Sequence, residues 1–243
     1  MIEQASEREA DEPSATDFVL GDVALSSRIM PVHTQRLGGD WCEAFPVSRD
    51  QIGLSIGDVC GHGESKYRAM AAIRRSIRDA ALRGSDPAHV LTVANRFLRE
   101  YDLTELATAI FAFLNIRSQT LVYANAGHPV PLLVGPAGSL YFEARSPDLP
   151  LGCEAEAVPR IYTVPLPPGS LLVLYTDGVT EHQRRPLEGV EQLRKAALRA
   201  YATATRSAAV SIERSMRLSA DNCDDAAILT ARTSSYSAQW NST

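Results

Sequence analysis

The segment that decides the fold runs Gly53-Leu54-Ser55-Ile56-Gly57-Asp58-Val59-Cys60-Gly61-His62-Gly63, and it joins two patterns of different period. Before the aspartate, Ile52, Leu54 and Ile56 alternate with smaller or polar residues, which favours a strand over 51–57. After the last glycine, apolar side chains recur at helical spacing in Tyr67, Met70, Ile73, Ile77 and Ala81. The segment therefore predicts a strand, an aspartate-bearing glycine turn and a long helix over 64–82.

Similar patterns extend outward from this segment. We expect further strands at 18–29, 40–47, 107–116, 119–125, 131–134, 139–143, 160–164, 171–175 and 226–231. A second helix should begin with Asp86 as its cap and Pro87 at its first position and run to about residue 101. Two later helices are expected at 189–201 and 205–218. Antiparallel-looking strands with helices inserted in pairs predict an α+β fold of stacked sheets flanked by helices.

The composition is that of one ordinary globular domain. The chain has 243 residues, of which 45% are hydrophobic and 22% charged, and its net charge is -5. No basic excess points to nucleic acid as a partner. Residues 1–16 are polar and acidic and are expected to form a disordered tail. One folded domain should cover 17–232, and the Ser-rich stretch 233–243 should be a flexible tail.

The same sequence argues against secretion and membrane insertion. The N-terminus is acidic and lacks an apolar signal region, and no apolar run is long enough to span a membrane. The four cysteines form no C-x-x-C pair, so neither a zinc site nor a thioredoxin-like motif is indicated. We expect a cytoplasmic protein with reduced thiols and no membrane partner.

Acidic residues stand where predicted strands meet turns. Asp40 follows two glycines, Asp58 opens the glycine turn, Asp177 precedes Gly178, and Asp224-Asp225 lies just before the last strand. Any one of these is typical of a turn. Together, carboxylates without a Cys or His cluster favour Mg²⁺ or Mn²⁺ over zinc. Two such ions can activate one water and clamp a phosphate.

The ordered set of motifs resembles the RsbU/SpoIIE branch of the metal-dependent serine/threonine protein phosphatases. The residues that carry the resemblance are Gly38-Gly39-Asp40-Trp41, Gly57-Asp58-Val59-Cys60-Gly61-His62-Gly63, Ala107-Thr108-Ala109, Asn125-Ala126-Gly127-His128-Pro129, Leu174-Tyr175-Thr176-Asp177-Gly178-Val179-Thr180-Glu181 and Asp224-Asp225. Each motif is weak alone, whereas the order and spacing of the whole set are specific. The resemblance covers about residues 18–232.

This resemblance implies a four-layer α/β/β/α sandwich of two antiparallel sheets, with a site for two divalent cations, Mn²⁺ or Mg²⁺, at one edge of the sheets. It implies a phosphatase domain over 17–232 that hydrolyses phosphoserine or phosphothreonine. The residues that match the family's metal ligands are Asp40, Asp58, Asp177 and Asp224, with the Val59 carbonyl as a backbone ligand. Asp225 is the weaker match of its pair. The glycines that would shape the turns are Gly39, Gly57, Gly61 and Gly63.

The resemblance also implies a partner. Substrates in this family are typically phosphorylated STAS-domain anti-anti-sigma proteins, whose dephosphorylation releases a sigma factor. No sensory domain is recognisable in the sequence, so we expect constitutive activity, or control by an activating partner or a homodimer. Two departures from the family stand out, namely Cys42 where a Tyr is common and a polar helix start at 64–68.

Several alternatives remain open at this stage. His62 is a possible proton donor to the leaving oxygen, or it packs the glycine turn. His128, in a Gly-His-Pro turn, should be structural. The G-x-S-x-G match around Ser55 would suit an esterase only if Ser55 stood at a sharp strand-to-helix turn. A further alternative is a catalytically weak docking module of the same fold that binds a partner-switching protein.

Overall fold

The computed structural model describes residues 14–31, 38–61, 63–100, 106–142, 148–181, 185–218 and 224–235. Two sheets with antiparallel pairing stack face to face in these ranges. The first has the order β1 (Ser14–Leu20), β2 (Val23–Met30), β11 (Ala226–Thr233), β10 (Leu171–Tyr175), β7 (Leu132–Gly135) and β8 (Gly138–Tyr141). The second has the order β3 (Trp41–Ser48), β4 (Gln51–Val59), β5 (Ala107–Asn115), β6 (Thr120–Ala126) and β9 (Ile161–Pro165).

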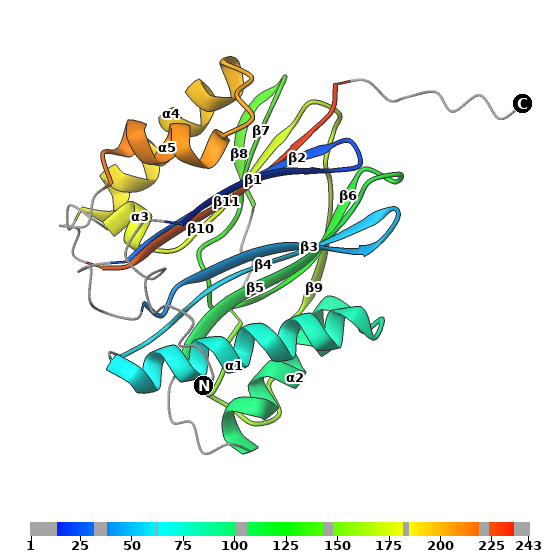
Figure 1. Cartoon of the computed structure of the whole chain (residues 1–243), viewed down its shortest axis with the longest axis vertical. Coiled ribbons are helices and arrows are strands. Elements are labelled where there is room, and N and C mark those ends of the chain that lie inside the picture. Colours follow the sequence, from blue (N-terminus) through cyan, green and yellow to red (C-terminus); the bar gives the residue numbers. More distant parts are fainter. Residues whose placement is uncertain are drawn as a thin grey trace, which may run out of the picture.

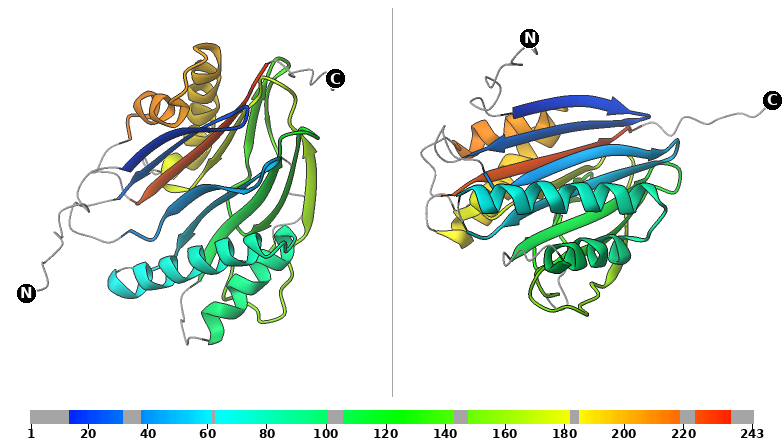
Figure 2. Two further views of the ribbon diagram at one scale, coloured as in Figure 1. Left: turned by 45° about the vertical axis from the view of Figure 1, so that its right-hand side comes forward. Right: turned by 60° about the horizontal axis from the view of Figure 1, so that its bottom comes forward.

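Helices cover the outer face of each sheet. The helices α1 (Gly63–Leu82) and α2 (Pro87–Glu100) lie against the β3-to-β9 sheet, and α4 (Pro186–Ala202) and α5 (Ala208–Met216) lie against the other (Figures 1 and 2). A short helix, α3 (Gly178–Glu181), follows β10. The predicted α/β/β/α sandwich is therefore confirmed. No helix within the described ranges is both long and apolar enough to cross a bilayer.

Alternation along the central strands explains why both sheet faces are buried. In β5, Phe111 packs toward α1 and α2, whereas its neighbours Ile110 and Ala112 lie between the sheets. Because successive side chains of a strand point to opposite faces, one strand supplies both layers of core. Leu54 of β4, on the face predicted from its alternation, also lies between the sheets.

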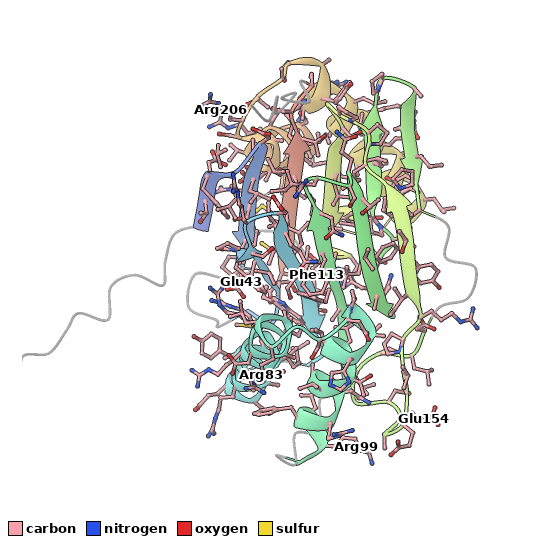
Figure 3. All side chains as sticks on the ribbon, turned by 90° about the vertical axis from the view of Figure 1, so that its right-hand side faces the viewer. Glu43, Arg83, Arg99, Phe113, Glu154 and Arg206 are labelled. Atoms are coloured by element: carbon pink, nitrogen blue, oxygen red, sulfur yellow. The ribbon has the colours of Figure 1, made fainter. Side chains whose placement is uncertain are left out.

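Charged contacts anchor α1 on its sheet. Glu43 of β3, labelled near this helix in Figure 3, pairs with Arg78 and lies 3.5 Å from Arg74. Two arginines of α1 are thus held by the sheet that the helix covers. The second helix begins as predicted: Pro87 is its first residue, and Oδ1 of Asp86 accepts a hydrogen bond from the His89 amide at 2.9 Å.

The structure corrects several element bounds. The single strand expected at 18–29 is a hairpin, because Gly21, with φ of 56°, turns the chain between β1 and β2. Strand β1 begins at Ser14, inside the stretch expected as a tail, and β11 extends to Thr233. Helix α4 begins three residues earlier than expected, at Pro186. Helix α3 was not predicted. The remainder of both predicted tails lies outside the described residues.

Candidate metal centre

Aspartates from both sheets lie at one edge of the sandwich. Asp40 directly precedes β3, and Asp58 is the second-last residue of β4. Asp177 comes two residues after β10, and Asp224 and Asp225 directly precede β11. We call these five residues the carboxylate cluster. The cluster exists because strand ends from both sheets meet at this edge, which is where the sequence placed the site.

Hydrogen bonds between the two sheets fix the inner side of the cluster. Thr176 Oγ1 donates to Oδ2 of Asp40 at 2.7 Å and accepts from the amide of Ala227 at 2.8 Å. The amide of Gly39 donates to Oδ2 of Asp225 at 3.0 Å. Asp40 and Asp225 are both buried, and their orientation is set before any ligand arrives.

A lysine enters the cluster from the first turn of α1. Lys66 Nζ lies 3.3 Å from Oδ2 of Asp225 and 3.4 Å from Oδ1 of Asp58, and only 8% of its side chain is exposed. A Cβ on Gly39 would lie 1.6 Å from Cε of Lys66. Glycine at position 39 is therefore what lets the lysine stem pass into the site.

The outer side of the cluster is open to solvent. Asp177 and Asp224 are exposed, although Gly178 N–H donates to Oδ1 of Asp177 at 2.9 Å and Asp225 N–H donates to Oδ1 of Asp224 at 2.8 Å. These bonds occupy one oxygen of each carboxylate. Because Asp177 and Asp224 are exposed, a phosphate on a protein surface has access to them.

Burial, together with the neighbouring negative charges, shifts the pKa values of these groups. Burial, and next the charge of Asp58, hold the pKa of Asp40 well above its usual range. The pKa values of Asp177 and Asp224 are also raised, mainly because the surrounding protein removes part of the water around their carboxylates although both residues are exposed, and the charge of Asp58 adds to both shifts. Burial alone would lower the pKa of Lys66, but the charges of nearby aspartates outweigh it and raise that pKa. The lysine is therefore a cation at neutral pH, and the cluster attracts cations.

The donor chemistry fits a hard divalent ion. All the donors are carboxylate oxygens, and Oδ1 of Asp58 is buried without a hydrogen-bond donor among the described residues. Yet no three Asp, Glu, His or Cys side chains in the described ranges are gathered closely enough to enclose one ion. Lys66 stands between Asp58 and Asp225 instead. The residues suit a metal on the open side of Asp58, and a lysine fills the inner side.

The predicted turn glycines and the other residues around Asp58 are placed by the backbone. Gly61 and Gly63 have φ of 108° and 83°, so the turn after Val59 uses conformations that favour glycine. Val59 N–H donates to the Gly39 carbonyl at 3.4 Å, while the ligand role of its own carbonyl stays a prediction. Gly57 pairs with Trp41 across β3 and β4. His62 lies outside the described residues.

Two sequence alternatives are resolved by burial. Ser55 is fully buried inside β4, where its Oγ accepts a hydrogen bond from Trp41 Nε1 at 2.9 Å. It cannot act as an exposed nucleophile. His128 is buried, its Nδ1 is 2.8 Å from Thr108 Oγ1, and its amide donates to Asn125 Oδ1 at 2.7 Å, which agrees with the expected structural role.

Three residues of the site make contacts that the sequence reasoning did not predict. Thr176 sits next to Asp177 in the quoted motif, and its position before an aspartate was its only signal. Asp225, taken as the weaker of its pair, is the buried one that contacts Gly39 and Lys66. The polar helix start had been recognised as a departure from the family, but the sequence did not show that Lys66 points into the site.

The chain is similar in sequence to known phosphatases. The family model of Stage II sporulation protein E (SpoIIE) matches residues 48–234. The phosphoserine phosphatase RsbU of Bacillus subtilis (strain 168) is 26% identical over 159 residues, which are 65% of this chain and 47% of RsbU. The chain spans less than half of the length of the curated relatives it matches.

Solved structures share the fold. The RsbU and RsbW domains of Rv1364c from Mycobacterium tuberculosis align with a TM-score of 0.78 and 26% identity, over 92% of this chain and 62% of that one. RsbX in complex with magnesium aligns with a TM-score of 0.72 and 17% identity, over 91% of this chain and all of that one.

Proposed function

The chain belongs to the SpoIIE family, and from this premise we propose that it is a metal-dependent phosphatase of phosphoserine or phosphothreonine in proteins. The observation that carries the proposal is the carboxylate cluster, which takes Asp40 and Asp58 from one sheet and Asp177, Asp224 and Asp225 from the other. The similarity to RsbU, a phosphoserine phosphatase, supports the same chemistry.

The roles of the residues follow from their positions. Asp58, a partly buried carboxylate at the end of β4, and the exposed Asp177 and Asp224 would hold divalent metal, Mn²⁺ or Mg²⁺. Metal bound there supplies an activated water and neutralises phosphate charge. Thr176 keeps Asp40 oriented by its hydrogen bond, and the fixed carboxylates repel a bare phosphate. The site therefore accepts a phosphate monoester only after its charge has been balanced.

The exposure of the site and the relatives support a proposal for the substrate class. The two exposed carboxylates, Asp177 and Asp224, lie beside the ends of β10 and β11, where the phosphorylated loop of a folded protein would have access to them. We propose a phosphorylated STAS-domain anti-anti-sigma protein as the substrate, in a partner-switching pathway. The relatives that support this are RsbU and Rv1364c, in which RsbU and RsbW domains occur together.

The test is phosphate release from p-nitrophenyl phosphate and from a phosphoserine STAS protein, with Mn²⁺, with Mg²⁺ and with excess EDTA. We expect turnover that requires metal. It should fall about 100-fold or more in Asp177→Asn, because Asp177 is a direct metal ligand in this proposal and the substitution removes its charge. Asp79→Asn, an exposed aspartate of α1, is the control and should match the wild type. Turnover that survives EDTA, or that Asp177→Asn leaves intact, contradicts the proposal.

A second candidate is favoured by one observation. Because Lys66 partly neutralises the cluster, a weakly active docking module that binds a partner-switching protein is the alternative. It predicts tight binding of the STAS partner with little phosphate release under any metal condition, whereas the phosphatase predicts efficient, metal-dependent release. The same assay, paired with a binding measurement, separates the two.

A further inference from the structure

The position of Lys66 within the carboxylate cluster is not required by the proposed function. The residue belongs to the first turn of α1, while most polar residues of this helix face solvent or pair with Glu43. Its stem crosses Gly39 and its ammonium is buried between aspartates of both sheets. A long, flexible side chain loses rotamer freedom in such a place, so its contacts must offset that cost.

The ammonium stands where a metal would compete for the same oxygen. Oδ1 of Asp58 meets Lys66 Nζ at 3.4 Å and accepts no hydrogen bond from the described residues. An Mg²⁺ ion binds a carboxylate oxygen at about 2.0–2.1 Å and needs near-octahedral space around it. A divalent ion on the inner side of Asp58 would therefore collide with the lysine and be repelled by its charge.

The charges divide the cluster into two sides that share Asp58. On the inner side, Asp40, Asp58 and Asp225 all act electrostatically on Lys66. On the outer side, Asp58 and Asp224 act on Asp177, which is exposed. The charge of Lys66 also acts on Asp224, but the ion pairs of Lys66 are with Asp58 and Asp225. One fixed positive charge inside and an open set of carboxylates outside suit a single divalent ion.

We propose that the ammonium group of Lys66 serves as a built-in cation on the inner side of the carboxylate cluster, in place of one divalent ion. The wild-type chain then binds one divalent ion fewer than a chain without this charge. The inference rests on the proposed metal dependence and deepens it, because it assigns the two sides of the site different cations.

The experiment counts metal ions in the intact chain. Titration calorimetry and Mn²⁺ electron paramagnetic resonance are applied to the wild type, to Lys66→Met and to Lys66→Arg. Methionine keeps an apolar stem over Gly39 and removes the charge, so Lys66→Met should gain one Mn²⁺ per chain, bound about tenfold or more tightly than any second ion in the wild type. Lys66→Arg keeps the charge and should bind like the wild type. Lys195→Met, on the exposed surface of α4, is the matched control.

Stability supplies a readout independent of the count. Without metal, Lys66→Met removes the cation that balances the buried carboxylate charges and should melt at a lower temperature than the wild type. Mn²⁺ should restore its melting temperature by more than it raises that of the wild type. If Lys66→Met folds only when Mn²⁺ is present, the proposal is likewise supported.

Two results would overturn the inference. One is equal metal number and affinity, within about twofold, in Lys66→Met and the wild type. The other, which needs no variant, is two tightly bound Mn²⁺ ions in the wild type. Failure of the proposed function looks different: no variant releases phosphate, whatever number of ions it binds.

Discussion

At the scale of single residues, Asp58 is the centre of the site's electrostatics. Its charge acts on Asp40, Asp177, Asp224 and Lys66, and it even reaches the buried imidazole of His128. Asp58 stands near the end of the central strand β4 and has neighbours on both sides of the cluster. Its charge therefore couples the inner side to the outer side. Changes in bound cation therefore alter several proton equilibria at once.

His128 is predicted to make stability depend on pH. Burial is the main cause that lowers its pKa from the usual 6.5 to about 4, against the opposing charge of Asp58. The unfolded chain therefore takes up the proton first as pH falls, so stability is present above pH 6.5 and is lost between pH 6.5 and 4. At pH 5 the loss relative to pH 8 should be about 2 kcal/mol.

The measurement compares wild type and His128→Asn in urea at several pH values, with EDTA present. The raised pKa values of Asp40, Asp177 and Asp224 affect both proteins, so the difference isolates the histidine. The stability gap between the two proteins should shrink as pH falls from 7 to 5. A gap that stays constant with pH would rule out a buried neutral imidazole.

A site residue can be predicted from sequence when the pattern that marks it lies in the residues next to it along the chain. Asp58 and Asp177 were predicted because each sits beside glycine at the end of a strand, and that pattern is visible along the chain. The position of Lys66 was not predictable, because its direction depends on how α1 packs over β3 and β4. The inward position of Asp225 was not predictable for the same reason, because Asp225 contacts Gly39, which is far away in sequence.

At the scale of elements, α3 and α4 hold the loop of Asp177 in place. Gly189 lies in the first part of α4, where an added Cβ would be 1.8 Å from the Thr180 carbonyl oxygen of α3. We expect Gly189→Ala to destabilise the protein by about 1–3 kcal/mol, because backbone must move to admit the methyl group. This cost exceeds the gain of about 1 kcal/mol that alanine gives a helix interior.

Urea unfolding and phosphate release test this prediction together. Activity should fall with stability, since α3 starts directly after Asp177. Leu187→Ala, 89% exposed in the same helix, is the control and should change neither quantity. A Gly189→Ala protein more stable than the wild type would show that the two helices separate without cost.

The elements also show which helices and strands the hydrophobic periodicity of the sequence can predict and which it cannot. Strand β10 was predicted at its observed bounds because its apolar run is bounded by turn residues. The hairpin β1–β2 was predicted as one strand, because alternation continues on both sides of Gly21 and a two-residue turn hardly interrupts it. Helix α3, with four residues, is too short to display a helical period.

At the scale of the whole molecule, the site depends on the packing of one sheet against the other. The aspartates before β3 and in β4 belong to one sheet, and those after β10 and before β11 belong to the other (Figure 1). A core of residues from both sheets lies between them, including Leu54 of β4 and Leu229 of β11. Whatever loosens this core separates the two halves of the carboxylate cluster.

Leu54→Ala tests this dependence at a distance from the cluster. Leu54 is fully buried between the sheets, so its truncation should cost about 2–5 kcal/mol. Since both sheets share this core, far-UV circular dichroism and Trp41 fluorescence should report one common unfolding transition, shifted to lower urea. Leu140→Ala, 63% exposed on β8, should leave the transition in place. If the two signals instead separate in Leu54→Ala, the sheets unfold independently, and the carboxylates of each sheet would then have to hold metal without the other.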